Sequence, residues 1–182
     1  SKKVVNAMYH DYYEKIQQIL KNIHDGQSIK IETAAQLAAD SILNGGIIHV
    51  FGCGHSHMLA EEVFYRAGGL VPVNAILEPA LMLHTGAAKS SVLERMKGYA
   101  PLIFERYEIN KNDILIVSSN SGINSVPIEM ALEGVNKGKK VIGITSSAYF
   151  NEKSRHDSGK LLYQVVDLYI DNCVPKGDAV LD

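Results

Sequence analysis

The chain has 182 residues, the length of a single domain, and 46% of them are hydrophobic, which excludes a disordered protein. Its 18 basic and 20 acidic residues nearly cancel, so nucleic acid is not expected as the main partner. Two widely separated cysteines, Cys53 and Cys173, fit a reducing compartment, and no apolar run is long enough to span a membrane. We therefore expect a cytoplasmic protein with no membrane partner.

Two amphipathic helices are expected before the first strand. Apolar residues recur every three or four positions through residues 5–23, which is typical of a helix, and Asp25-Gly26 is expected to end it. A second helical stripe covers residues 31–43 and stops at residues 44–46. The two apolar stripes offer a surface to another subunit, so we expect a homo-oligomer, either a dimer or a tetramer.

Short apolar runs alternate with helical patterns in the rest of the chain. Such alternation is typical of a parallel sheet whose two faces are covered by helices. We therefore predict an α/β fold, a three-layer αβα sandwich around five parallel strands. The predicted strands are residues 47–51, 71–77, 114–117, 141–145 and 168–171, and the predicted helices between them are residues 58–67, 99–107 and 125 to about 137.

Three loops at the predicted strand ends are rich in glycine and hydroxyl residues: 52–56, 118–124 and 145–147. In an open parallel sheet, ligands collect beyond the carboxyl ends of the strands. Small residues in loop 118–124 let several backbone N–H groups point into one concavity, and the next helix adds its positive dipole end. Ser119, Ser121 and Asn124 can also donate hydrogen bonds, so we predict a phosphate site formed mainly by neutral donors. The alternative is that these residues only form turns and cap the helix.

Nucleotide and metal sites are weaker interpretations of the same residues. Loop 52–56 superficially resembles a dinucleotide fingerprint, but residue 57 is His, and no acidic residue clearly ends the second strand. No Gly-Lys-Ser/Thr sequence follows either glycine cluster, which excludes a Walker loop. His55 and His57 have no third ligand nearby in the sequence. We predict no metal and no cofactor, and a nucleotide-dependent enzyme stays as an alternative.

The two loops together resemble those of the sugar isomerase (SIS) domain family. Its first loop has the form glycine, any residue, glycine, any residue, serine, which Gly52, Gly54 and Ser56 match. Its second loop is matched by Ser119, Ser121, Gly122 and Asn124. The resemblance covers about residues 6–171 and implies a flavodoxin-like SIS fold. It implies a single domain with N-terminal helices in residues 1–45, a core in 46–171 and a tail in 172–182. Relatives usually continue past the fifth strand, so a shortened form is expected.

The resemblance also implies a ligand. Within the family the chain is similar to uncharacterised bacterial SIS proteins, to phosphoheptose isomerases and to N-acetylmuramic acid 6-phosphate etherases. It implies a phosphorylated sugar or amino sugar, and an aldose–ketose isomerase as the function. A non-catalytic sugar-phosphate sensor and a phosphosugar lyase or etherase are the alternatives. The implied binding residues are Gly54, His55, Ser56, Ser119, Asn120, Ser121, Gly122 and Asn124.

An aldose–ketose isomerase needs a base that moves a proton between adjacent carbons, usually with a second acid. Glu78 follows the second predicted strand at the ligand edge and is the predicted base. His84 is the predicted second group, in its own site or in that of a neighbouring subunit. Glu62, on the helix after the first loop, is a further candidate if it is not on a solvated face. Residues 155–157, Arg-His-Asp, are interpreted as a surface salt-bridge cluster.

Overall fold

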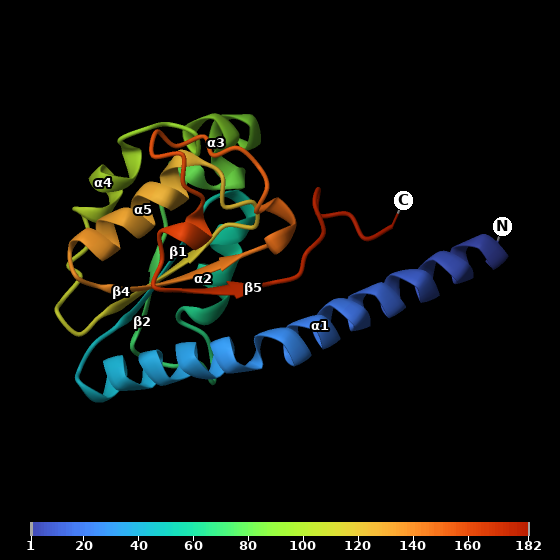
Figure 1. Ribbon diagram of the computed structural model, residues 1–182, viewed down its shortest axis with the longest axis horizontal. Helices are drawn as coiled ribbons and strands as arrows, with labels where there is room; N and C mark the ends of the chain where they lie inside the picture. The colour runs from blue at the N-terminus through green and yellow to red at the C-terminus, as the bar shows by residue number, and fades with distance from the viewer. Residues whose placement is uncertain (1, 182) are drawn as a thin grey trace.

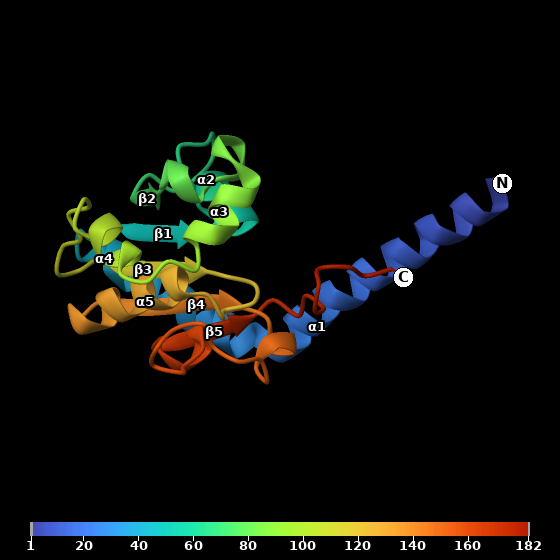
Figure 2. The ribbon, with the colours of Figure 1, turned by 90° about the horizontal axis from the view of Figure 1, so that it is seen from above.

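Five parallel strands form one sheet in the computed structural model, which describes residues 2–181 and, at the N-terminus, side chains from Met8 onward (Figures 1 and 2). The strand order is β2-β1-β3-β4-β5, which is the flavodoxin-like order, so the predicted fold class is confirmed. Predicted and observed strands differ by no more than two residues at either end. The strands are β1 (Ile48–Gly52), β2 (Val73–Ile76), β3 (Ile114–Ser118), β4 (Lys140–Thr145) and β5 (Leu168–Asp171).

The helices are α1 (Lys2–Leu43), α2 (Met58–Val63), α3 (Ala87–Leu93), α4 (Tyr99–Phe104) and α5 (Ser125–Asn136). Short 3₁₀ helices lie between them, of which η1 (Gly54–His57) follows β1 and η2 (Pro79–Leu81) follows β2. Helix α2 ends earlier than predicted because Phe64 is extended and Tyr65 has a positive φ of 48°. Across residues 2–181, we find no helix with the length and apolar character needed to cross a membrane.

The prediction of two N-terminal helices is wrong, because α1 is one continuous helix of 42 residues. Gly26 was expected to end the first helix, but a single glycine inside a helix costs only about 1 kcal/mol relative to alanine. Contacts on the C-terminal side of Gly26 favour the helix. Gln27 Oε1 accepts a hydrogen bond from the backbone N–H of Asp171 at 3.1 Å, and the Lys30 ammonium lies 3.4 Å from the centre of the Tyr169 ring.

Helices cover both faces of the sheet. The C-terminal half of α1 and α2 lie on one face, and α4 and α5 lie on the other. The core between β1, β3 and α5 contains Phe51, Leu115, Val117, Ile128 and Met130, all fully buried. Because both faces of the strands are covered, the carboxyl edge of the sheet is left as the place where the loops can meet a ligand.

The N-terminal half of α1 extends away from the sheet (Figures 1 and 2). The tail, residues 172–181, continues beyond β5 toward this half of α1 (Figures 1 and 2). Pockets between the tail and α1 are lined by Lys15 and Gln18 of α1 and by Pro175 and Leu181 of the tail. Large apolar side chains on this half of α1 are exposed to solvent. They are Met8, Tyr9, Tyr12, Tyr13 and Leu20, each at least half exposed.

Candidate functional site

Two polar loops leave the sheet side by side at its carboxyl edge. Gly52, the last residue of β1, is the register partner of Ser118, the last residue of β3. The first loop, residues 53–57, and the second loop, residues 119–124, therefore begin at adjacent positions. The strand order reverses between β1 and β3, since β2 lies on one side of β1 and β3 on the other. This reversal is the place where open α/β sheets bind ligands.

The first loop is a tight turn that requires glycine at residue 52. A side chain there would place its Cβ only 2.4 Å from the carbonyl oxygen of Ser56. The Ser56 N–H donates to the carbonyl of Cys53 at 3.0 Å, which closes the turn into η1. His57 is buried, with Nδ1 bonded to the Gly54 carbonyl and Nε2 3.5 Å from Glu61. His57 therefore stabilises the loop, whereas His55 is exposed at its rim.

The second loop is held by its own hydrogen bonds. Ser119 is buried, and its hydroxyl oxygen accepts a hydrogen bond from the N–H of Gly122 at 3.2 Å. Gly122 has a φ of +62°, and a Cβ there would lie 2.8 Å from Oγ1 of Thr145. The side chain of Asn120 donates to Asp178 of the tail and accepts from Asn172 at 3.0 Å. These bonds connect the loop to the tail, and Oγ1 of Thr145 in β4 donates to the Asn120 carbonyl at 3.2 Å.

The hydroxyls of Ser56 and Ser121 lie in the first and the second loop. Within the part of the chain that the structure describes, the side chains of Ser56 and Ser121 form no hydrogen bond, and both residues are partly exposed. The Ser119 hydroxyl oxygen, by contrast, accepts a hydrogen bond within the loop, and its O–H remains able to donate. Among the predicted serine ligands, Ser56 and Ser121 therefore have the hydroxyls without any bond in the described residues.

Asn124 has a different environment from the one expected of a phosphate ligand. Its side chain is buried, and Oδ1 accepts a hydrogen bond from Nη1 of Arg155 at 2.6 Å. With Oδ1 directed at Arg155, the amide nitrogen is left to face the carboxylate of Glu94. The contacts of Asn124 thus connect a cation and an anion that come from distant parts of the chain.

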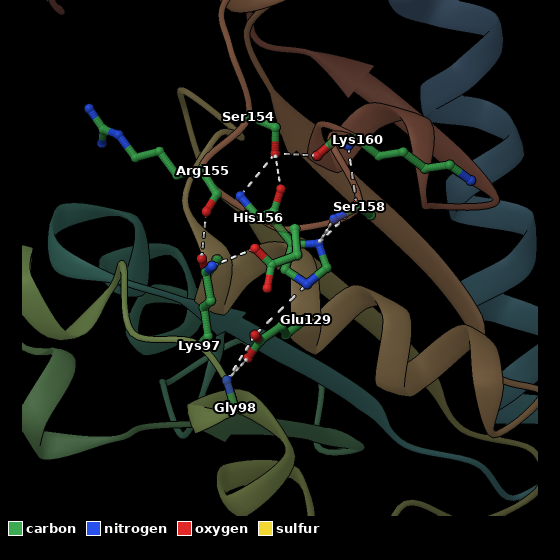
Figure 3. A network of polar contacts seen from close by, with 10 residues as sticks. Lys97, Gly98, Glu129, Ser154, Arg155, His156, Ser158 and Lys160 are labelled. Carbon is green, nitrogen blue, oxygen red and sulfur yellow. Dashed lines mark hydrogen bonds and ion pairs between the residues drawn. The ribbon is translucent and has the colours of Figure 1, made fainter.

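Arg155 is brought to the second loop by the segment that follows β4. Its backbone N–H donates to the carbonyl of Ile123 at 2.8 Å, and its carbonyl accepts from the Ser125 hydroxyl at 3.2 Å. Figure 3 shows the network that holds this segment. His156 lies 3.8 Å from Glu129 of α5, whose carboxylate also accepts from the Gly98 N–H at 2.9 Å. The second loop, which has no lysine or arginine of its own, is therefore in contact with one arginine from a distant segment.

Residues 155–157 were interpreted as a surface salt-bridge cluster, and of the three only Asp157 forms a salt bridge at an exposed position. That carboxylate pairs with Lys97, and both side chains are more than half exposed. His156 is only 15% exposed and lies against Glu129. No local sequence signal distinguishes Arg155 from an ordinary surface arginine, because its partner Asn124 lies 31 positions earlier.

Glu94, just after α3, is an acidic residue that the sequence did not indicate. Its backbone carbonyl accepts a hydrogen bond from the N–H of Val126, in the first turn of α5, at 3.0 Å. Burial raises the pKa of the Glu94 carboxyl above its ordinary value, and Asn124, Arg95 and Arg155 offset part of that rise. Burial, together with the Glu94 charge, raises the pKa of the Cys53 thiol. A carboxyl whose affinity for protons is higher than usual thus lies between the two loops.

The three predicted catalytic residues lie in different surroundings. Glu78 is at the carboxyl end of β2 as expected, but its side chain is 10% exposed and lies 3.0 Å from Nη1 of Arg106. It also accepts from the N–H of Ala80 at 3.3 Å, which caps η2. Glu62 on α2 is exposed and pairs with Arg66. His84 is exposed in a short 3₁₀ helix.

Comparisons with known proteins identify the family and the fold of the chain. The family described as the SIS domain matches residues 11–146. UPF0309 proteins of Halalkalibacterium halodurans and Geobacillus thermodenitrificans are 52% and 50% identical to the chain over 175 residues, which are 96% of this chain and 70% of each relative. Solved phosphoheptose isomerases from Francisella tularensis and Neisseria gonorrhoeae have TM-scores of 0.66 and 0.68 at 21% and 16% identity. The matches cover 99% and 97% of this chain and 88% and 90% of those chains, and they show a shared fold.

Proposed function

Because the chain belongs to the SIS domain family, we propose that it binds a phosphorylated sugar or amino sugar at the two loops and interconverts its aldose and ketose forms. The observation that carries the proposal is the pairing of Gly52 with Ser118, which places the first and second loops at the switch point of the sheet. The hydroxyls of Ser56 and Ser121 are then on adjacent loops, and neither bonds to another of the residues that the structure describes.

The proposed phosphate site combines these hydroxyls with backbone N–H groups and with the start of α5. A helix of 12 residues begins directly after the second loop, so its positive dipole end favours an anion there. In this proposal Gly54, His55 and Gly122 form the walls, and Ser119, Asn120 and Asn124 hold the loops in place. The solved relatives named as phosphoheptose isomerases support a sugar phosphate as the ligand class.

We propose further that the chain assembles as a homo-oligomer through the projecting half of α1. The exposed apolar side chains there recur at helical spacing, as in Tyr9, Tyr13 and Leu20. Covering these apolar side chains with a second copy of the chain removes them from water, which stabilises the assembly. A dimer or a tetramer would satisfy this surface.

A ligand screen tests the proposed function. Hexose 6-phosphates, pentose 5-phosphates and hexosamine 6-phosphates, in aldose and ketose forms, are added to the protein and its thermal midpoint is measured. We expect a rise with at least one sugar phosphate and none with the matching unphosphorylated sugar, since ligands that bind only the folded state stabilise it. Turnover of each stabilising compound is then measured. Equal midpoints with and without the phosphate group would exclude the proposed site.

A further inference from the structure

We infer that Glu94 is the residue that moves the proton in the proposed isomerisation. This inference rests on the proposed function and gives the reaction a residue. It stands on the place of Glu94 between the two loops and on the contacts that orient it.

The position of Glu94 is fixed from two sides. Helix α3, which ends directly before it, packs against η1 of the first loop. On the other side, the Glu94 carbonyl is bonded to the N–H of Val126 at the start of α5, immediately after the second loop. Glu94 therefore bridges the two segments that would hold the phosphate of the sugar, and the residue is only partly buried.

Each element packed around the Glu94 carboxyl contributes one group. Asn124 faces it from the second loop, Cys53 from the first loop, Arg155 from the segment after β4, and Arg95 from its own segment. The hydrogen bond of 2.6 Å from Arg155 to Asn124 fixes the direction of the amide, so that its N–H₂ group faces the carboxylate. The Cys53 thiol is buried and its pKa is raised, so it stays protonated, which leaves the Glu94 carboxyl as the acidic group in this cluster that can accept and return a proton.

The proton transfer is balanced without any further reactant. The Glu94 carboxylate removes the proton from the carbon next to the sugar carbonyl, so a C–H bond breaks and an O–H bond forms on Glu94. The C–H electron pair becomes the double bond of an enediolate. The proton of the neighbouring hydroxyl moves to the former carbonyl oxygen, and Glu94 returns its own proton to the former carbonyl carbon. The aldose has then become the ketose, and Glu94 is a carboxylate again.

Glu78 and Glu62 are less suited to this role. The Glu78 carboxylate is occupied by Arg106 and by the N–H of Ala80, and losing these bonds would leave an arginine without its partner. Glu62 is 68% exposed in a pair with Arg66, so water surrounds it.

Solvent deuterium exchange tests the assignment. The wild-type protein and Glu94→Gln are each incubated in D₂O with every sugar phosphate that stabilises the wild type, and NMR follows deuterium entering the carbon beside the carbonyl. We expect Glu94→Gln to bind each compound within about threefold of the wild type but to exchange at least about a hundredfold more slowly. Glu94→Asp should recover part of the rate. Glu133→Gln, on α5 and paired with Lys137, is the matched control and should exchange at the wild-type rate.

The outcomes separate the inference from the function on which it depends. If no sugar phosphate binds, the proposed function fails, and the role of Glu94 fails with it. If the wild type binds but exchanges no deuterium, binding stands and the role of Glu94 is wrong. If Glu94→Gln exchanges at the wild-type rate, or if Glu78→Gln alone loses exchange, the proton belongs to another residue. Loss of both binding and exchange in Glu94→Gln would assign Glu94 to the loop framework instead.

Discussion

Nε2 of His49 lies 3.0 Å from Oδ2 of Asp113, and the two side chains are only 3% and 1% exposed. Asp113 also accepts hydrogen bonds from the N–H groups of Ile47, at 2.8 Å, and Asn110, at 2.6 Å. Burial alone would raise the pKa of the Asp113 carboxyl, but the hydrogen bonds from His49, Asn110 and Ile47 outweigh it and hold the pKa below 3.8. This pair ties the start of β1 to the start of β3, at the edge of the sheet opposite the candidate site.

Replacing Asp113 with alanine should lower the free energy of unfolding by about 3 kcal/mol or more. The change leaves His49 and two backbone N–H groups buried without an acceptor, and each such group costs about 1–3 kcal/mol. Urea denaturation at pH 7 measures the difference. Asp157→Ala is the control, because the Asp157 carboxylate is 75% exposed and should matter little. Equal losses for the two variants would contradict a structural role for the buried pair.

Gly122→Ala should destabilise the fold by about 2 kcal/mol. Its φ of +62° is unfavourable for any residue with a side chain, and the new Cβ would lie 2.8 Å from Thr145. Gly26→Ala should do the reverse and stabilise α1 by about 0.5–1 kcal/mol, since nothing lies within 4 Å of a Cβ at that position. Urea midpoints of both variants check the pair of predictions, and a shift in the same direction would refute one of them.

Ser121→Ala should weaken the binding of a sugar phosphate about ten- to a hundredfold. A hydrogen bond to a charged group contributes about 1.5–3 kcal/mol. Within residues 2–181 the Ser121 hydroxyl forms no other hydrogen bond. Calorimetry should find little change for the unphosphorylated sugar. Ser91→Ala, at an exposed position of α3, is the matched control. Unchanged affinity in Ser121→Ala would reduce the second loop to a helix cap.

Glu94→Gln should make the protein more stable than the wild type at pH 8. Because burial raises the pKa of Glu94, the folded state binds a proton more tightly than the unfolded chain does. The stabilisation of the wild type by that proton is present below the ordinary value of 4.5 and is lost as the pH rises through the raised value. The excess stability of Glu94→Gln is about 1.4 kcal/mol for each unit of the rise, and it should vanish below pH 4. An excess that does not change with pH would contradict this linkage.

Leu20→Glu combined with Tyr12→Glu should convert the oligomer into a monomer at micromolar concentration. These side chains are 61% and 50% exposed on the projecting half of α1, and burying a charge against a second copy is strongly unfavourable. Sedimentation velocity measures the change. Val71→Glu, at a 94% exposed apolar residue outside α1, should leave the assembly unchanged. A wild-type monomer would rule out the proposed interface.

Local sequence patterns predict the sheet well. A short apolar run indicates a buried strand, and a glycine after an amphipathic stretch indicates the end of a helix, so both can be recognised from adjacent residues. The two loops are also visible in the sequence, since Gly52 and Gly122 are needed for turns that no other residue fits well. The single helix α1 was missed because tertiary contacts near Gln27 outweigh a local helix breaker. Glu94 and Arg155 were missed for a related reason. Burial raises the pKa of Glu94, and a partner 31 positions away holds Arg155. Neither effect can be predicted from the residues adjacent to them in sequence.

The candidate site draws one part from each of the four crossovers that connect the strands. The first loop opens the crossover from β1 to β2, Glu94 lies in the next, the second loop opens the third, and Arg155 lies in the last. Since parallel pairing brings together residues far apart in sequence, these parts meet only after the whole sheet has formed. A partly folded chain therefore has no site, and a bound sugar phosphate should slow unfolding while leaving the folding rate unchanged.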